Sequence, residues 1–175
     1  PWARMVAGHC FSSIGQHDRA LGELRAALAH NPSFALGHMA YGWALLRAGD
    51  FDRAIAESGL ALSLSPIDSF SGFYTSVHGL ALLGARRFAE ALPFLRSSVA
   101  AFAEHVGHYN SLISCCGHLG LLDEAKEYIA IRNRIGPPVG LRVLRENLAA
   151  FAHRDAFVEG LKKAAVPEGA RLSRT

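Results

Sequence analysis

The side chains best suited to chemistry gather between residues 105 and 118, where three histidines and two cysteines lie close in the chain. His105 and His108 are one helical turn apart, and Cys115 lies further along the same possible helix face. Cys115 and Cys116 would point about 100° apart on a helix, and no Cys-x2-Cys pair is present, whereas zinc sites usually show tighter ligand spacing. The sequence therefore favours core thiols with surface or groove histidines, and it implies no metal and no cofactor.

Catalytic motifs are equally sparse. The chain has no Gly-x-Ser-x-Gly, no phosphate-binding loop and no His-Glu-x-x-His. The carboxylates of Asp123, Glu124, Glu23 and Glu57 fall at positions that usually face solvent, so they do not suggest paired acids on a shared cavity wall. These residues predict that the chain itself is not an enzyme.

The composition is that of a globular chain. Half of its 175 residues are apolar and 19% are charged, which is too apolar for disorder and suits one domain with a continuous core. The longest uncharged stretches, 69–85 and 106–122, fall short of the ~20 apolar residues that a membrane-spanning helix needs. We therefore predict no membrane partner.

Charge and cysteine usage indicate the partners and the compartment. The net charge is +3, and the basic residues are scattered except for a short cluster near the C-terminus (Lys162, Lys163, Arg171 and Arg174). A nucleic-acid-binding protein would concentrate basic residues on one face, so no nucleic-acid partner is predicted. Three cysteines, two of them adjacent, make a poor disulfide framework and indicate a reducing, cytoplasmic location. Because the first residue is Pro1 and not Met, we expect a fragment or a processed chain.

These side chains must be positioned by repeated elements. Residues 51–66 align without a gap with residues 17–32, which lie 34 residues earlier. The pattern continues into a third unit after an insertion of three residues around 67–72, and then into a fourth. One position is alanine in all four units, as Ala20, Ala54, Ala91 and Ala125.

The recurring residue types have physical reasons. The alanines fall where paired helices would approach most closely, and a larger side chain there would cost a few kcal/mol in overpacking, about 1–3. A residue that precedes proline disfavours the helical backbone conformation. Pro32 and Pro66 therefore each mark the end of the second helix of a repeat. A glycine follows the first helix of a repeat, where it can take the left-handed conformation that ends a helix. An aspartate begins the second helix as a cap or first-turn acid. These pairs are Gly15 and Asp18, Gly49 and Asp52, and Gly120 and Asp123.

With this 34-residue period, the chain resembles tetratricopeptide repeats from Pro1 to about Pro138. The resemblance implies an all-α, right-handed superhelix of helix-turn-helix repeats with C-terminal capping helices. The predicted units are repeats at about 1–34, 35–68, 72–105 and 106–138, capping helices at 139–166 and a flexible tail at 167–175. Within the capping region we expect one helix over Val139–Ala152 and a second that is capped by Asp155 and ends before Pro167.

A second resemblance concerns the setting of the domain. The segments Tyr41–Ala56 and Phe157–Glu168 are similar to bacterial tetratricopeptide domains that follow class III adenylate/guanylate cyclase domains or winged-helix DNA-binding domains. This implies that the chain is a regulatory or interaction part of a larger bacterial protein. No cyclase or DNA-binding residue is carried over, because the sequence contains no such domain.

In this family the first helices line a concave groove that binds partners. Transferring its groove positions to this sequence predicts a partner-binding surface, apolar in the first three repeats and small and polar in the fourth, that includes Trp2, Met5, His9, Leu36, Met39, Trp43, Leu46, Arg47, Phe73, Leu80, Leu83, Asn110 and His118. Such a groove suits an apolar or helical segment of a protein partner. The lysine, asparagine and arginine residues with which some family members bind a terminal carboxylate are absent from the corresponding positions.

Three functional hypotheses follow. The first is a scaffold that binds a protein or peptide in the concave groove. The second is a structural module whose groove is filled by its own chain or by a second copy, as in a homodimer, since large exposed apolar patches are rare on monomers. The third is a sensor that binds a small ligand between the tryptophan and methionine side chains.

Overall fold

The computed structural model describes residues 1–169, and the regular elements in this part of the chain are all helices. Four pairs come first: α1 (Trp2–Ser13) with α2 (His17–His30), α3 (Ala35–Ala48) with α4 (Phe51–Leu64), α5 (Ser71–Gly84) with α6 (Phe88–Ala101), and α7 (Val106–Leu119) with α8 (Leu122–Ile135). Two shorter helices, α9 (Leu141–Asn147) and α10 (Arg154–Lys163), follow.

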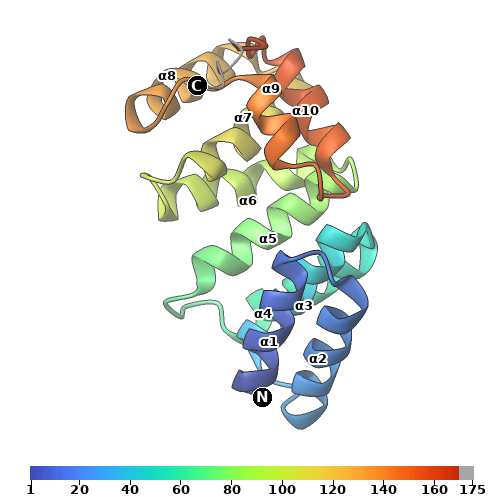
Figure 1. Ribbon diagram of the computed structural model, residues 1–175. Helices are drawn as coiled ribbons and strands as arrows, with labels where there is room; N and C mark the ends of the chain where they lie inside the picture. The colour runs from blue at the N-terminus through green and yellow to red at the C-terminus, as the bar shows by residue number, and fades with distance from the viewer. Residues whose placement is uncertain (170–175) are drawn as a thin grey trace.

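The pairs stack in chain order into a curved column (Figure 1). The backbones of the first helices of successive pairs approach one another closely. In the described residues those of the second helices do not, although side chains such as Arg96 of α6 and Glu124 of α8 meet in an ion pair, so the first helices form the inner layer. None of the described helices has both the length and the apolar character needed to span a bilayer.

Close packing within the column depends on small side chains. The four recurring alanines, Ala20, Ala54, Ala91 and Ala125, are completely buried, as their spacing predicts. Around them lie larger core residues, including Leu24, Leu45, Leu95 and Leu112. Because any larger side chain at the alanines would force the helices apart, these positions fix the distance between neighbouring helices.

The turns between paired helices follow the predicted pattern with one exception. Gly15, Gly49 and Gly120 have φ angles of 78°, 90° and 71°, in the left-handed region that glycine adopts without strain. In the third repeat Arg86 takes this conformation at φ 60°. Its backbone N–H donates a hydrogen bond to the Leu83 carbonyl oxygen at 3.0 Å, which helps to hold the turn in place of a glycine.

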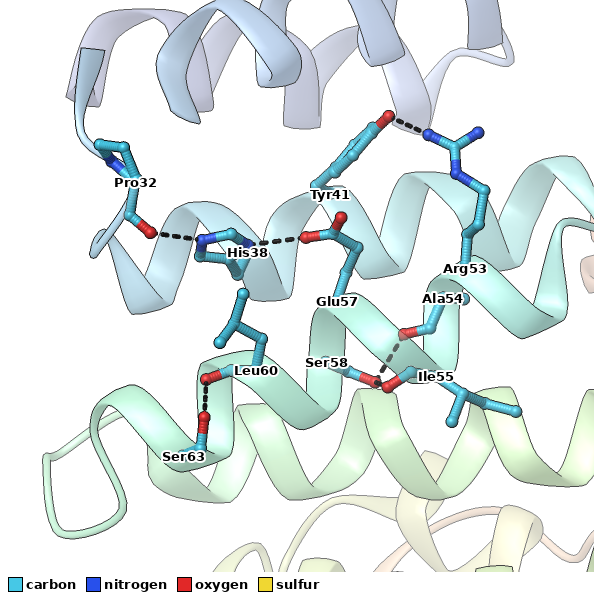
Figure 2. Close-up of polar contacts among 10 residues, drawn as sticks. All are labelled: Pro32, His38, Tyr41, Arg53, Ala54, Ile55, Glu57, Ser58, Leu60 and Ser63. Carbon is cyan, nitrogen blue, oxygen red and sulfur yellow. Dashed lines mark hydrogen bonds and ion pairs between the residues drawn. The ribbon is translucent and has the colours of Figure 1, made fainter. Parts of the chain in front are cut away.

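Side-chain hydrogen bonds fix α4 against α3 (Figure 2). The imidazole of His38 lies between the Glu57 carboxylate, 2.6 Å from Nδ1, and the Pro32 carbonyl oxygen, 2.8 Å from Nε2. About one turn away along each helix, Arg53 donates to the Tyr41 hydroxyl oxygen at 2.5 Å. These bonds set the register of the second repeat, whose first helix contributes Leu36, Met39, Ala40 and Trp43 to the cavity described below.

The C-terminal segment, residues 139–169, differs in detail from the prediction. The helix expected over Val139–Ala152 ends at Asn147, and Asp155 lies in the first turn of α10 and not at its N-cap, which is His153. Glu168 was expected in a flexible tail, but its carbonyl oxygen accepts a hydrogen bond from Arg142 N–H at 3.1 Å. Residues 170–175 of that predicted tail lie outside the described part of the chain.

The three cysteines provide a test of the packing. Cys115 and Cys116 are completely buried, and burial raises the pKa of their thiols to about 12 and about 11, whereas Cys10 is exposed. Because the thiolate is the reactive form, we expect a thiol-specific chromogenic disulfide at pH 8 to modify one thiol rapidly and all three only in urea. Rapid modification of more than one thiol in the native protein, or of any in a Cys10→Ser variant, would contradict this packing.

Candidate functional site

An apolar cavity of about 580 Å³ lies between the first helices and the C-terminal segment. We call it the groove cavity. Its inner wall is built by α1, α3, α5 and α7, and its outer wall by α9 and the residues that follow it. The size falls within the range typical of sites that bury a small molecule or a few side chains of a partner.

Most of the predicted groove residues meet in this cavity. Its wall includes eight of them: Met5, His9, Leu36, Met39, Trp43, Phe73, Leu80 and Asn110. They come from four helices that are adjacent in space although they span about a hundred residues of sequence. The repeat period thus brings one strip of each first helix to the same surface.

The other five predicted residues lie elsewhere. Leu46 and Leu83 are fully buried in the core, so they cannot contact a partner, and the prediction was wrong for both. Trp2 is 56% exposed and packs against Phe34 outside the cavity, at 5.1 Å between ring centroids. Arg47 packs against Phe151, and the half-buried His118 hydrogen-bonds the Ala156 carbonyl oxygen of α10, so the C-terminal segment lies against both.

The outer wall of the cavity was not predicted. Leu144 of α9 and, after that helix, Leu148, Phe151 and His153 face the first helices across the cavity. Phe151 packs edge-on against Trp43 at 5.9 Å between centroids. The helical spacing of these leucines was visible in the sequence, but nothing in it indicated that they pack across the groove.

Helix α10 holds this wall in place by packing against α7. The two helices cross where Gly117 and Gly160 face each other, so closely that a Cβ on either would lie within 3.0 Å of the other helix's backbone. Ser114 Oγ donates to the Phe157 carbonyl oxygen at 2.8 Å, and His118 Nε2 donates to that of Ala156 at 2.7 Å. The α10 helix therefore covers the last repeat, and the chain before it is carried back over the groove.

One end of the cavity is polar. His108 Nδ1 lies 2.5 Å from Ser98 Oγ and 3.2 Å from Ser76 Oγ, and its ring stacks on Phe102. Burial, with a smaller contribution from the charge of His105, lowers the pKa of His108 to about 4, so the imidazole is neutral near pH 7. Within residues 1–169, no group of three or more His, Cys, Asp or Glu side chains is arranged to hold a metal ion.

The cavity carries no formal charge on its walls and is reached beside two exposed aromatic rings. None of its lining residues is Asp, Glu, Lys or Arg. Phe70 and Phe73, at 40% and 44% exposure, stand at its edge, and the Phe73 ring packs on Phe102 at 4.7 Å. A ligand entering there would meet the Phe70 and Phe73 rings close to the hydrogen-bonding groups around His108, and His153 adds a polar group elsewhere in the lining.

The stack of helix pairs, with its first helices inside and its small residues at the crossings, is a tetratricopeptide-type superhelix. A family model described as "Tetratricopeptide repeat" matches residues 11–66, which include α2, α3 and α4. The predicted fold class is thereby confirmed. The search of curated proteins found no match to this sequence.

Solved structures share the fold across almost the whole chain. YrrB, described as a TPR protein with an unusual peptide-binding site, is 21% identical with a TM-score of 0.66, over 92% of this chain and 82% of that one. MamA from AMB-1 is 20% identical with a TM-score of 0.67, over 97% and 93% of the two chains. MamA from MSR-1 is 19% identical with the same TM-score, over 93% and 92%. At these identities the likeness shows the fold, which is one that generally serves as a scaffold for protein interactions.

Proposed function

We propose that this chain is an interaction module that binds a short apolar segment of a partner protein in the groove cavity. The observation that carries the proposal is the continuous apolar wall from Met5 of α1 across Met39 and Trp43 of α3 to Leu80 of α5, with no formally charged residue in the lining. Methionine and tryptophan side chains adapt to different apolar surfaces and commonly anchor partners. The peptide-binding site named for the similarly folded YrrB agrees with this use of the fold.

The geometry limits how the partner enters. Helix α10 already lies along α7. A helix of the partner, about 10–12 Å across, therefore could not also lie along α7. The exposed rings of Phe70 and Phe73 mark the accessible edge of the cavity. The partner would therefore insert a few large apolar side chains past these rings, and its backbone would remain outside.

The wider setting is also a proposal. The resemblance of Tyr41–Ala56 and Phe157–Glu168 to domains linked to cyclases or winged-helix proteins supports a regulatory role within a larger, cytoplasmic bacterial protein. Reading the gene upstream of the codon for Pro1 tests this, because neither domain would be encoded there if the proposal is wrong.

The binding proposal predicts the effect of a charge in the cavity. Peptides selected from a random display library on the immobilised chain would be synthesised with a fluorophore, and their affinities measured by anisotropy. Leu80→Glu places a carboxylate in an apolar wall, so we expect at least about tenfold weaker binding, or 1.4 kcal/mol.

The matched control is Leu60→Glu, which makes the same change on a 41% exposed residue of α4 outside the cavity. It should leave the affinity within about twofold, a difference of less than 0.5 kcal/mol. Far-ultraviolet circular dichroism checks that both variants fold. If a selected peptide binds both variants as tightly as the unmodified chain, it does not use the groove cavity and the proposal fails.

A further inference from the structure

Arg47, in the last turn of α3, is a buried cation without an acidic partner. It is 8% exposed, and within residues 1–169 no carboxylate forms an ion pair with it. Its Nε is buried and no protein group accepts a hydrogen bond from it. Removing a guanidinium from water is costly unless a counter-charge or hydrogen-bond acceptors replace the water, so the surroundings of Arg47 suit an anion.

The guanidinium of Arg47 packs against two aromatic rings of the cavity wall, although Arg47 itself is not one of the lining residues. The guanidinium carbon lies 4.1 Å from the centre of the Phe151 ring and 5.9 Å from that of Trp43. Both rings line the groove cavity. An aromatic ring covers the flat face of a guanidinium and leaves the N–H groups at its edge free, and a carboxylate binds this edge with two parallel hydrogen bonds.

A second unpaired nitrogen lies next to Arg47. His153 is 3% exposed, lines the cavity, and has a buried Nδ1 without a hydrogen-bond partner. Burial, followed by the charge of Arg47, lowers the pKa of His153 to about 4. The ring is therefore neutral near pH 7, and in the tautomer protonated at Nδ1 it can donate one hydrogen bond to an anion without adding charge.

We propose that the groove cavity binds a small carboxylic acid with a long apolar body. The carboxylate would accept hydrogen bonds from the Arg47 edge and from His153, and the apolar body would lie against Met39, Leu80 and Leu148. One buried cation balances one negative charge, which favours a carboxylate over a phosphate dianion. The cavity volume of about 580 Å³ suits such a molecule. This inference goes beyond the protein segment proposed above and does not depend on it.

The test uses Trp43 as a reporter. The chain has two tryptophans, so in a Trp2→Phe variant the fluorescence comes from Trp43 alone, which lines the cavity. This variant would be titrated at pH 7.5 with decanoate, 1-decanol and decylammonium, each below the concentration at which it aggregates. The three probes share one chain and differ in the charge of the head group.

We expect a saturable change in Trp43 fluorescence, with decanoate binding at least about tenfold more tightly than decanol and decylammonium more weakly than either. Adding Arg47→Met, which keeps an apolar stem and removes the charge, should abolish the preference for decanoate and leave decanol binding in place. Equal affinities for decanoate and decanol, no saturable signal, or an unchanged preference in Arg47→Met would each overturn the proposal. If Arg47→Met does not fold, the order of the affinities of the three probes for the Trp2→Phe protein decides whether the proposal holds. Peptide binding is measured separately, so either proposal can fail alone.

Discussion

Replacing Gly160 with alanine is expected to lower the free energy of unfolding by about 2 kcal/mol, because the added Cβ overpacks the crossing of α10 and α7. That Cβ would lie within 3.0 Å of the Ser114 carbonyl oxygen, Ser114 Oγ and a carbon of the His118 ring. The helices must separate, which weakens the hydrogen bond from Ser114 Oγ to the Phe157 carbonyl oxygen. Urea unfolding followed by circular dichroism measures the loss.

The matched control is the same change at Gly22 in α2, where a Cβ would meet nothing within 4 Å. Alanine is the better helix former, so Gly22→Ala should raise stability by about 0.5–1 kcal/mol. The two variants thus have opposite expected signs. Equal effects would mean that the close approach of α10 to α7 does not contribute to stability.

Acidification should destabilise the fold, and His153 should make a large contribution to this effect. Its pKa is lowered to about 4 from the ordinary 6.5, because the buried ring is neutral in the folded protein. Between pH 6.5 and 4 the unfolded chain therefore binds more protons than the folded one, so the free energy of unfolding falls as the pH falls. A shift of this size corresponds to about 3 kcal/mol when the pH reaches 4.

His108, whose pKa is also lowered to about 4, should act in the same direction. Urea unfolding at several pH values between 7.5 and 4 measures how steeply the free energy of unfolding falls with pH. His153→Leu should make this fall shallower, whereas His30→Leu, which replaces an exposed histidine of α2, should leave it unchanged. A His153→Leu variant with the full acid sensitivity of the parent would show that burial of this imidazole is not the cause.

The repeat fold could be predicted because each of its requirements is local. Ala54 and Gly49 meet steric conditions that hold wherever two helices cross or a helix ends in a left-handed residue, so their spacing specified the helix pairs. Arg86 shows the limit of this logic, since it occupies a left-handed turn for which the sequence gives no glycine signal.

The groove was predicted less completely, because it depends on contacts between distant segments. Met39, Trp43 and Leu80 face the cavity as their repeat positions implied, whereas Leu46 and Leu83 are enclosed by neighbouring helices. The outer wall could not be found from periodicity, which describes one helix face but not the surface it meets. Arg47 was assigned to the groove surface, and its burial follows from the position of Phe151.

The position of the C-terminal segment has a mechanical consequence. In an open array of repeats each unit contacts only its neighbours, so the array bends elastically and its ends can unravel one repeat at a time. Here Phe151 packs on α3 while α10 packs on α7, which ties the second repeat directly to the fourth. Such a cross-link resists changes in curvature and couples the melting of the repeats between its two attachment points.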